Sequence, residues 1–176
     1  MKPHAGAALL ILCIAHAPCA EPAMRLASAD MKDGTALAKV HYYPRCGGRN
    51  LSPDLRWDGP PNATSYALTL VDRSVAPAHW SHWIVLDIPA GTHRLAQGAM
   101  LPAGAKTIAS DFGDLSYDGP CPPAGSGVHH YDFTVYAFVA PQPPVPPGLN
   151  AMQLSGWLSR ASVAYATLSV TAETSK

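Results

Sequence analysis

The sequence predicts a mainly β protein with one helix near its C-terminal end. Apolar and polar residues alternate through several short runs, as they do in a strand with one buried face. The chain of 176 residues contains 18 prolines and 14 glycines, which suit frequent turns and disfavour long helices. Its length and its 48% hydrophobic residues favour one domain with a substantial core.

The N-terminal segment MKPHAGAALLILCIAHAPCAEPA has the pattern of a signal peptide, with Lys2, an apolar run over residues 5–15 and small residues before Glu21. We therefore expect a signal peptide at residues 1–20 and a single mature domain at residues 21–176 that is periplasmic or secreted. The apolar run is about half as long as the ~20 residues that cross a bilayer, so no stable membrane insertion is expected.

Alternation predicts five strands, with Gly and Pro clusters between them, at residues 36–43, 66–71, 82–88, 131–139 and 163–170. Before the last strand, PQPPVPPG at residues 141–148 predicts a stiff extended connector, and a recognition motif for a partner is the alternative. A helix is predicted to follow from Asn150, a suitable N-cap, because Leu154, Trp157 and Leu158 recur at helical spacing.

Charge and motifs argue against several classes of function. Twelve basic and twelve acidic residues balance without a run of like charge, so no binding of nucleic acid or of an anionic membrane surface is expected. The phosphate-loop pattern GxxxxGK[ST] and the nucleophile pattern GxSxG are both missing. Ser126, in AGSGV, follows no predicted strand. Any recognition of an anion must therefore be local.

The cysteines predict one disulfide. Cys13 and Cys19 fall in the signal segment, which leaves Cys46 and Cys121 in the mature chain. Outside the reducing cytosol, an even pair is more often bonded than free, and the spacing expected of zinc ligands is missing. A metal-binding or catalytic thiol is the alternative. A lipid-modified Cys19 is a further alternative, although Pro18 directly before it fits such a site poorly.

Strand alternation also predicts which histidines point inward. In the run HWIVLDI, His82 shares a face with Ile84, Leu86 and Ile88. In the run HHYDFTVYAFV, His129 and Tyr131 share the apolar face, whereas His130 and Asp132 alternate onto the other one. Either inward histidine could be a core residue with satisfied ring nitrogens. A metal site is another alternative, with ligands drawn from His79, His82, His93, His129 and His130.

Three blocks of sequence, in order, resemble the phosphatidylethanolamine-binding protein family, also called the Raf kinase inhibitor protein family, and in particular its bacterial secreted branch. The blocks are CGGRNLSPDLRW (residues 46–57), ALTLVDRSVAPAHWSHWIVLDIP (residues 67–89) and DFGDLSYDGPCPPAGSGVHHYDFTVYAF (residues 111–138). The resemblance implies a large antiparallel sheet packed against a smaller sheet, with a C-terminal helix. It also implies a small pocket for phosphate-like anions.

The resemblance assigns the residues of this pocket. They are Asp72, His82, His129, Tyr131 and the preceding loop from Tyr117 to Pro123, with Tyr117, Gly119, Pro120, Cys121, Pro122 and Pro123 expected as contacts. It also brings Cys46 and Cys121 together. The chain departs from the family at DRSVAP, where the family often has DPDAP, so the rim of the pocket differs while Asp72 is retained.

The sequence therefore predicts a binding protein for a phosphate-bearing or other anionic small molecule such as a lipid headgroup, acting as a carrier or an inhibitor. Imidazole and phenol groups can donate hydrogen bonds to phosphate oxygens, and N–H groups of the Gly/Pro turn can point at the same anion. No cofactor or metal is expected, and a protein partner stays open. The alternative is an enzyme that uses the same His, Asp and Tyr residues for acid–base chemistry.

Overall fold

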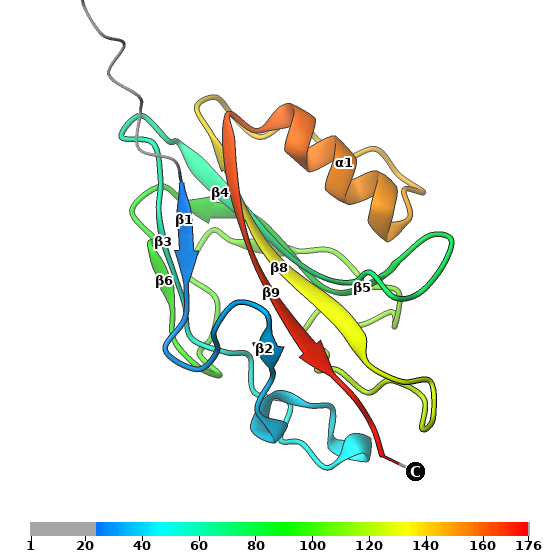
Figure 1. Ribbon diagram of the computed structural model, residues 1–176. Coiled ribbons are helices and arrows are strands. Elements are labelled where there is room, and N and C mark those ends of the chain that lie inside the picture. The colour runs from blue at the N-terminus through cyan, green and yellow to red at the C-terminus, as the bar shows by residue number, and fades with distance from the viewer. Residues whose placement is uncertain (1–23, 176) are drawn as a thin grey trace, which may run out of the picture.

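Two sheets and one helix make up the fold, which a computed structural model describes over residues 24–175 (Figure 1). The larger sheet has the order β2-β9-β8-β4-β5-β7 and consists of β2 (Thr35–Ala36), β4 (Ser65–Asp72), β5 (Trp80–Pro89), β7 (Lys106–Thr107), β8 (His129–Phe138) and β9 (Ala164–Ala172). The smaller sheet has the order β1-β3-β6 and consists of β1 (Arg25–Ala27), β3 (Leu55–Asp58) and β6 (Arg94–Leu95). The mainly β fold predicted from the sequence is confirmed.

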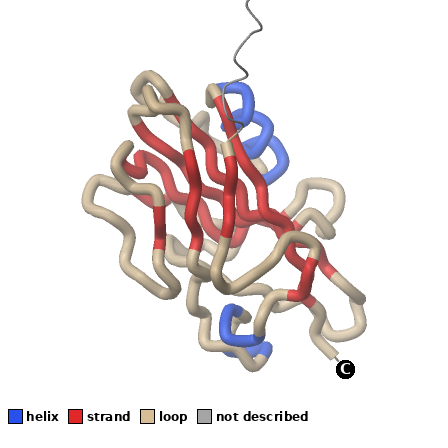
Figure 2. The backbone as a smooth tube through the Cα atoms, turned by 60° about the vertical axis from the view of Figure 1, so that its left-hand side comes forward, coloured by secondary structure: helices blue, strands red, loops and turns tan. Residues whose placement is uncertain are grey.

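The larger sheet is mixed. β2 runs parallel to β9, whereas the other neighbouring strands of this sheet are antiparallel. Figure 2 shows its long strands side by side, with the helix α1 (Ala151–Ala161) on one face. The predicted large antiparallel sheet is therefore confirmed, with one parallel pairing at its β2 edge.

Two apolar clusters hold the three layers together. One lies between the sheets, where Trp57 and Leu95 of the smaller sheet join Leu68, Phe133 and Val135 of the larger one. The other lies between the opposite face of the larger sheet and α1, and its members include Ala67, Ile84, Tyr136, Phe138, Leu154 and Leu158. Both faces of the central strands are thus buried, as in a sheet covered on both sides.

The predicted C-terminal helix is present and is capped as expected. The Asn150 side chain accepts a hydrogen bond from the backbone N–H of Gln153 at 2.9 Å, and the Gln153 side chain accepts one from the N–H of Asn150 at 3.1 Å. This reciprocal pair is a capping box, which satisfies two otherwise free helix-end donors. Leu154 and Leu158 are four residues apart and bury the same helix face against the sheet.

The strand predicted at residues 36–43 is wrong in most of its length. Only Thr35–Ala36 pairs as β2, and short 3-10 helices follow at Lys39–His41 and Pro44–Cys46. Burial is consistent with the difference, because His41 and Tyr42 are adjacent and both buried, which a strand with one buried face cannot satisfy. This segment instead folds into a compact loop at one end of the larger sheet.

The predicted disulfide is present. Cys46 and Cys121 are bonded, with their Cα atoms 5.4 Å apart, which lies within the usual range for disulfides. The bond joins the loop that follows β2 to the loop that precedes β8, two segments separated by 75 residues. No helix within residues 24–175 is long and apolar enough to cross a membrane. The predicted signal peptide at residues 1–20 lies outside the described residues.

Candidate functional site

Antiparallel pairing brings the first two predicted site residues together. Asp72 ends β4, and His129 begins β8; because the two strands run in opposite directions, the end of one lies beside the start of the other. The Asp72 Oδ2 atom lies 2.6 Å from His129 Nδ1. Asp72 is 3% exposed and His129 is 9% exposed, so this pair is largely shielded from water.

The carboxylate of Asp72 is held on both oxygens. Its second oxygen, Oδ1, accepts the backbone N–H of Ser74 at 2.8 Å. An ionised carboxylate only accepts hydrogen bonds, so the Nδ1 atom of His129 carries the proton in this pair. Asp72 thereby fixes both the orientation and the tautomer of the His129 ring.

His82 reaches the same cluster because of a bulge in β5. Leu70 of β4 pairs with Trp83, but Val71 pairs with Ser81, which leaves His82 as an extra residue. A bulge changes which face the neighbouring side chains occupy. The His82 ring centroid consequently lies 5.2 Å from that of Tyr131, on the face that packs against the smaller sheet.

The face predicted for His82 is therefore wrong, although its burial is confirmed. Alternation placed it with Ile84 and Leu86, and these two residues pack under α1. A second irregularity, between the Tyr66 and Leu68 pairs, leaves Asp87 in a left-handed conformation with φ of 54°. Ile88 then returns to the cluster between the two sheets. Simple alternation fails across each extra residue because it assumes an unbroken pleat.

The protonation state of His82 follows from its contacts. Its Nδ1 atom lies 2.9 Å from the backbone carbonyl oxygen of Asp118, which can only accept, so Nδ1 carries the proton. Burial lowers the pKa of His82 to about 4, because the charged ring would lose its hydration. At neutral pH the ring is uncharged, and its Nε2 atom is an acceptor.

Tyr131 completes the cluster from β8, directly opposite Asp72 in the strand pairing. Burial first, and then the charge of Asp72 and a hydrogen bond to it, raise the pKa of Tyr131 above its ordinary value. The phenol therefore stays protonated, and its hydrogen is donated to Asp72. Its ring also stacks against that of His129, with centroids 6.4 Å apart.

The loop at residues 117–123 forms a wall that the rest of the chain holds in place. The Tyr117 hydroxyl donates to the carbonyl of His41 at 2.9 Å, and the backbone N–H of Tyr43 donates to the carbonyl of Pro120 at 3.1 Å. Gly119 approaches so closely that a Cβ there would lie 2.0 Å from the His41 carbonyl oxygen. The glycine at this position is thus required by contact between two backbones.

Asn50 clamps this loop and was not among the residues predicted from the sequence. Its amide donates to the carbonyl of Tyr117 at 2.9 Å, and its Oδ1 accepts the N–H of Gly119 at 2.7 Å. It has a positive φ of 56°, which asparagine tolerates better than most residues. An asparagine close after two glycines is a turn signal in the sequence. Its hydrogen bond to Tyr117, 67 residues away, could not be inferred from that local pattern.

The expected N–H groups of this turn are mostly committed or missing. Pro120, Pro122 and Pro123 have no N–H, and Gly119 donates to Asn50. The Cys121 N–H is the remaining donor among residues 119–123. These residues therefore offer at most one backbone donor, and their contact with an anion stays a prediction.

Two residues that the prediction did not include lie at the rim. Phe112, which is 49% exposed, packs edge-on against His82 with centroids 5.0 Å apart. Ser126 is also exposed, and its Oγ atom lies 3.0 Å from His129 Nε2. Both come from loops without a regular pattern, so the sequence offered no signal of their position.

The alternative of a histidine metal site is not supported by the arrangement. His79 lines a cleft beside α1, whereas His82 points to the opposite face of the larger sheet. Within residues 24–175, no group of three or more His, Cys, Asp or Glu side chains is arranged to hold a metal ion.

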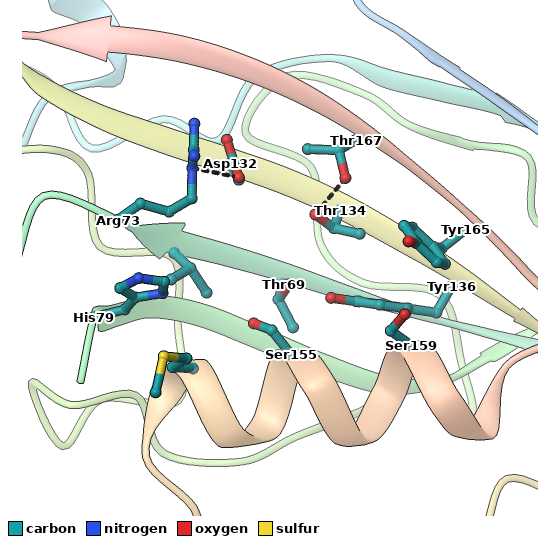
Figure 3. Close-up of a pocket in the computed structure, with 12 residues that line it drawn as sticks. Thr69, Arg73, His79, Asp132, Thr134, Tyr136, Ser155, Ser159, Tyr165 and Thr167 are labelled. Atoms are coloured by element: carbon teal, nitrogen blue, oxygen red, sulfur yellow. Dashed lines mark hydrogen bonds and ion pairs between the residues drawn. The ribbon is translucent and has the colours of Figure 1, made fainter. Parts of the chain in front are cut away.

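That cleft has a volume of about 220 Å³ and contains none of the predicted site residues (Figure 3). Arg73 and Asp132 form an ion pair of 2.6 Å at one end, and the hydroxyls of Thr134 and Thr167 lie 2.9 Å apart along its floor. The paired charges leave the cleft without a free cation to attract an anion.

Comparison with known proteins agrees with this architecture. A family model described as phosphatidylethanolamine-binding protein matches residues 27–173. The Escherichia coli protein YbcL is 33% identical over 156 residues, covering 83% of this chain and 85% of its own. A Mycobacterium tuberculosis relative, LppC, is named as a candidate lipoprotein and is 38% identical over 153 residues, covering 86% of this chain and 73% of its own.

Solved structures share the fold. The crystal structure of E. coli YbcL, described as a new member of the mammalian PEBP family, superposes with a TM-score of 0.75 at 31% identity and covers 85% of this chain and 98% of that one. The carboxypeptidase Y inhibitor in complex with its proteinase superposes with a TM-score of 0.53 at 17% identity, covering 87% and 84%. The second likeness concerns the fold alone.

Proposed function

Since the chain belongs to the phosphatidylethanolamine-binding protein family, we propose that it is an extracytoplasmic binding protein for a small phosphate-bearing or similarly anionic ligand. The ligand binds at the cluster of Asp72, His82, His129 and Tyr131, and the protein acts as a carrier or an inhibitor. The observation that carries this proposal is the convergence of two imidazoles and a phenol around one buried carboxylate.

The disulfide and one relative support the location. A bond between Cys46 and Cys121 persists in an oxidising compartment and is rare in the cytosol. The name of LppC, as a candidate lipoprotein, is compatible with the same side of the membrane.

The hydrogen-bonding roles in the cluster favour an oxyanion that still carries a proton. Neutral His82 offers a lone pair at Nε2, so it accepts a hydrogen bond from a P–OH group and cannot donate one. His129 in its charged form is a donor from Nε2 to a remaining P–O⁻ oxygen. A phosphate monoester that bears one proton satisfies both kinds of group, whereas a sulfate ester has no proton to give.

Access to the cluster requires a small rearrangement at its rim. His82 and Tyr131 are 3% and 1% exposed, and the exposed side chains of Phe112 and Ser126 cover the two imidazoles. Both covering residues lie in surface loops, which move more easily than strands. The binding step is therefore a local displacement of these two side chains.

Calorimetry with methyl phosphate and methyl sulfate at pH 5.5 tests the proposal, because the phosphate ester is then largely protonated and His82 is neutral. We expect wild type to prefer methyl phosphate, and His82→Phe to lower this preference by about 10- to 100-fold, the loss of one hydrogen bond to a charged group. His130→Asn, on the exposed opposite face, is the matched control. Equal binding of the two esters, or equal binding by His82→Phe and wild type, would contradict the proposal.

A further inference from the structure

The His129 ring is hydrogen-bonded through both nitrogens to groups of different chemistry. Its Nδ1 atom faces Asp72 Oδ2 at 2.6 Å, and its Nε2 atom faces Ser126 Oγ at 3.0 Å. A hydroxyl, an imidazole and a buried carboxylate are thus connected in the atom order of a serine hydrolase triad. Such a triad is recognised by geometry and roles, and its members occur in different chain orders on unrelated folds.

The tautomer of His129 determines what the Ser126 hydroxyl does. Because Asp72 holds the proton on Nδ1, neutral His129 presents a lone pair at Nε2, to which the Ser126 hydroxyl can donate when it turns from the Pro123 carbonyl. The Pro123 carbonyl lies 2.7 Å from Oγ and is the other acceptor for this hydroxyl. The neutral ring is therefore the state in which His129 can act as a general base.

The turn presents Ser126 in a way that suits a nucleophile. Gly125 and Gly127, on either side, have φ values of 82° and 86°, and Ser126 itself is exposed, while His129 and Asp72 behind it are buried. The backbone N–H of Ser126 itself donates to the Pro123 carbonyl at 3.0 Å, which leaves the N–H of Gly127 as the donor beside the hydroxyl. Within residues 24–175, the N–H of Gly127 makes no hydrogen bond inside the protein. It directly follows the nucleophile and can stabilise an oxyanion.

We propose that Ser126 and His129 are catalytic residues for the hydrolysis of small carboxylic esters, and that Asp72 is the positioning residue. This activity goes beyond anion binding and uses a residue, Ser126, outside the proposed anion cluster. The Ser126 hydroxyl lies on the surface. The expected substrates are therefore esters whose carbonyl carbon can approach this hydroxyl directly from solvent.

The reaction proceeds through an acyl-enzyme. Ser126 Oγ forms a bond to the carbonyl carbon as its proton passes to His129 Nε2, and the carbonyl oxygen becomes an oxyanion near the Gly127 N–H. The oxyanion then collapses, the C–O bond to the alcohol breaks, and the alcohol takes the proton from Nε2. Water attacks the acyl carbon while His129 removes its proton, and return of that proton to Ser126 Oγ releases the acid.

The test uses the mature protein with a fluorophosphonate reagent and p-nitrophenyl acetate. We expect the reagent to attach to Ser126, located by peptide mass spectrometry, and Ser126→Ala to lower ester hydrolysis by about 100-fold or more. Ser159→Ala, on α1, is the matched control and should leave both signals unchanged. Labelling of another residue, or equal hydrolysis by Ser126→Ala and wild type, would overturn the proposal.

The positioning role of Asp72 is tested separately, by proton NMR. The Nδ1 proton of His129 should give a far-downfield proton NMR signal in wild type and in Ser126→Ala, and this signal should disappear in Asp72→Asn together with the fluorophosphonate labelling. An unaltered signal or labelling rate in Asp72→Asn would contradict its role. Methyl phosphate binding by Ser126→Ala separates the two functions, because removing the covering hydroxyl keeps the anion cluster and should not weaken that binding.

Discussion

At the scale of single residues, the chemistry of the site depends on which hydrogen-bond partner each ring nitrogen has. The sequence predicted that His82, His129 and Tyr131 lie inward, and all three are buried. It could not predict that the Asp118 carbonyl fixes the tautomer of His82, because that contact joins residues 36 positions apart. The expectation that both imidazoles donate to an anion therefore does not fit neutral His82, whose Nε2 atom is an acceptor, and for His129 it stays a prediction.

The low pKa of His82 predicts a pH dependence of stability. The unfolded chain binds a proton on this ring below about pH 6.5, but the folded protein does so only below about pH 4, so stability decreases as pH falls between these values. The loss attributable to His82 is about 3 kcal/mol. Urea unfolding from pH 7 to 4 should show a shallower decrease for His82→Gln than for wild type and for the control His130→Gln. Parallel curves for all three proteins would contradict the assignment.

Asn50 is predicted to stabilise the loop at residues 117–123. Asn50→Ala removes two hydrogen bonds and places a residue with a Cβ at a positive φ that alanine tolerates poorly, which should cost about 2–3 kcal/mol. Asn50→Gly keeps the backbone conformation and loses only the hydrogen bonds, so it should be less destabilised. Equal unfolding free energies for wild type and Asn50→Ala would show that the clamp contributes nothing.

At the scale of elements, alternation was reliable where the pleat is unbroken. In β8 it placed Tyr131, Phe133 and Val135 on one face, and these residues do pack between the two sheets. In β5 it failed, because His82 and Asp87 are extra residues relative to β4. Bulges carry little local signal, and their positions depend on the partner strand. The bulge at His82, which made its predicted face wrong, also turns this side chain toward the site.

The helix α1 is predicted to be anchored mainly by Leu158, which is fully buried against the larger sheet. Leu158→Ala should lower the unfolding free energy by about 3 kcal/mol, since it removes a buried side chain and leaves a cavity. Met152→Ala, at a position on the same helix that is 46% exposed, should change stability by less than about 0.5 kcal/mol. Urea denaturation of both variants measures the difference, and similar costs would contradict the packing described for α1.

At the scale of the whole molecule, the sequence predicted the two-sheet architecture through a resemblance spread over three ordered blocks, and the family match covers residues 27–173. The pairing of Cys46 with Cys121 followed from counting the cysteines of the mature chain. The parallel β2 edge and the compact loop at residues 37–48 did not, because their contacts with β9 and with the loop before β8 lie far away in sequence. The local sequence pattern therefore does not predict segments whose structure depends on backbone contacts with residues far away in the chain.

The disulfide is predicted to stabilise the whole fold. It closes a loop of 75 residues, for which the chain-entropy model gives about 4 kcal/mol. Replacing Cys46 and Cys121 together by serine should lower the unfolding free energy by about this amount, and reduction of wild type should reproduce the loss. A double variant as stable as the oxidised protein would show that the bond adds no constraint.

The central claim is that His82 and His129 bind a protonated phosphate ester between them, and nitrogen NMR of the imidazoles tests it most directly. Methyl phosphate added at pH 5.5 is predicted to shift the Nε2 signals of His82 and His129 with one common dissociation constant, His82 as an acceptor and His129 as a donor. Methyl sulfate is predicted to shift these signals far less. Shifts confined to His79, which lines the cleft beside α1, with His82 and His129 unchanged, would contradict the claim.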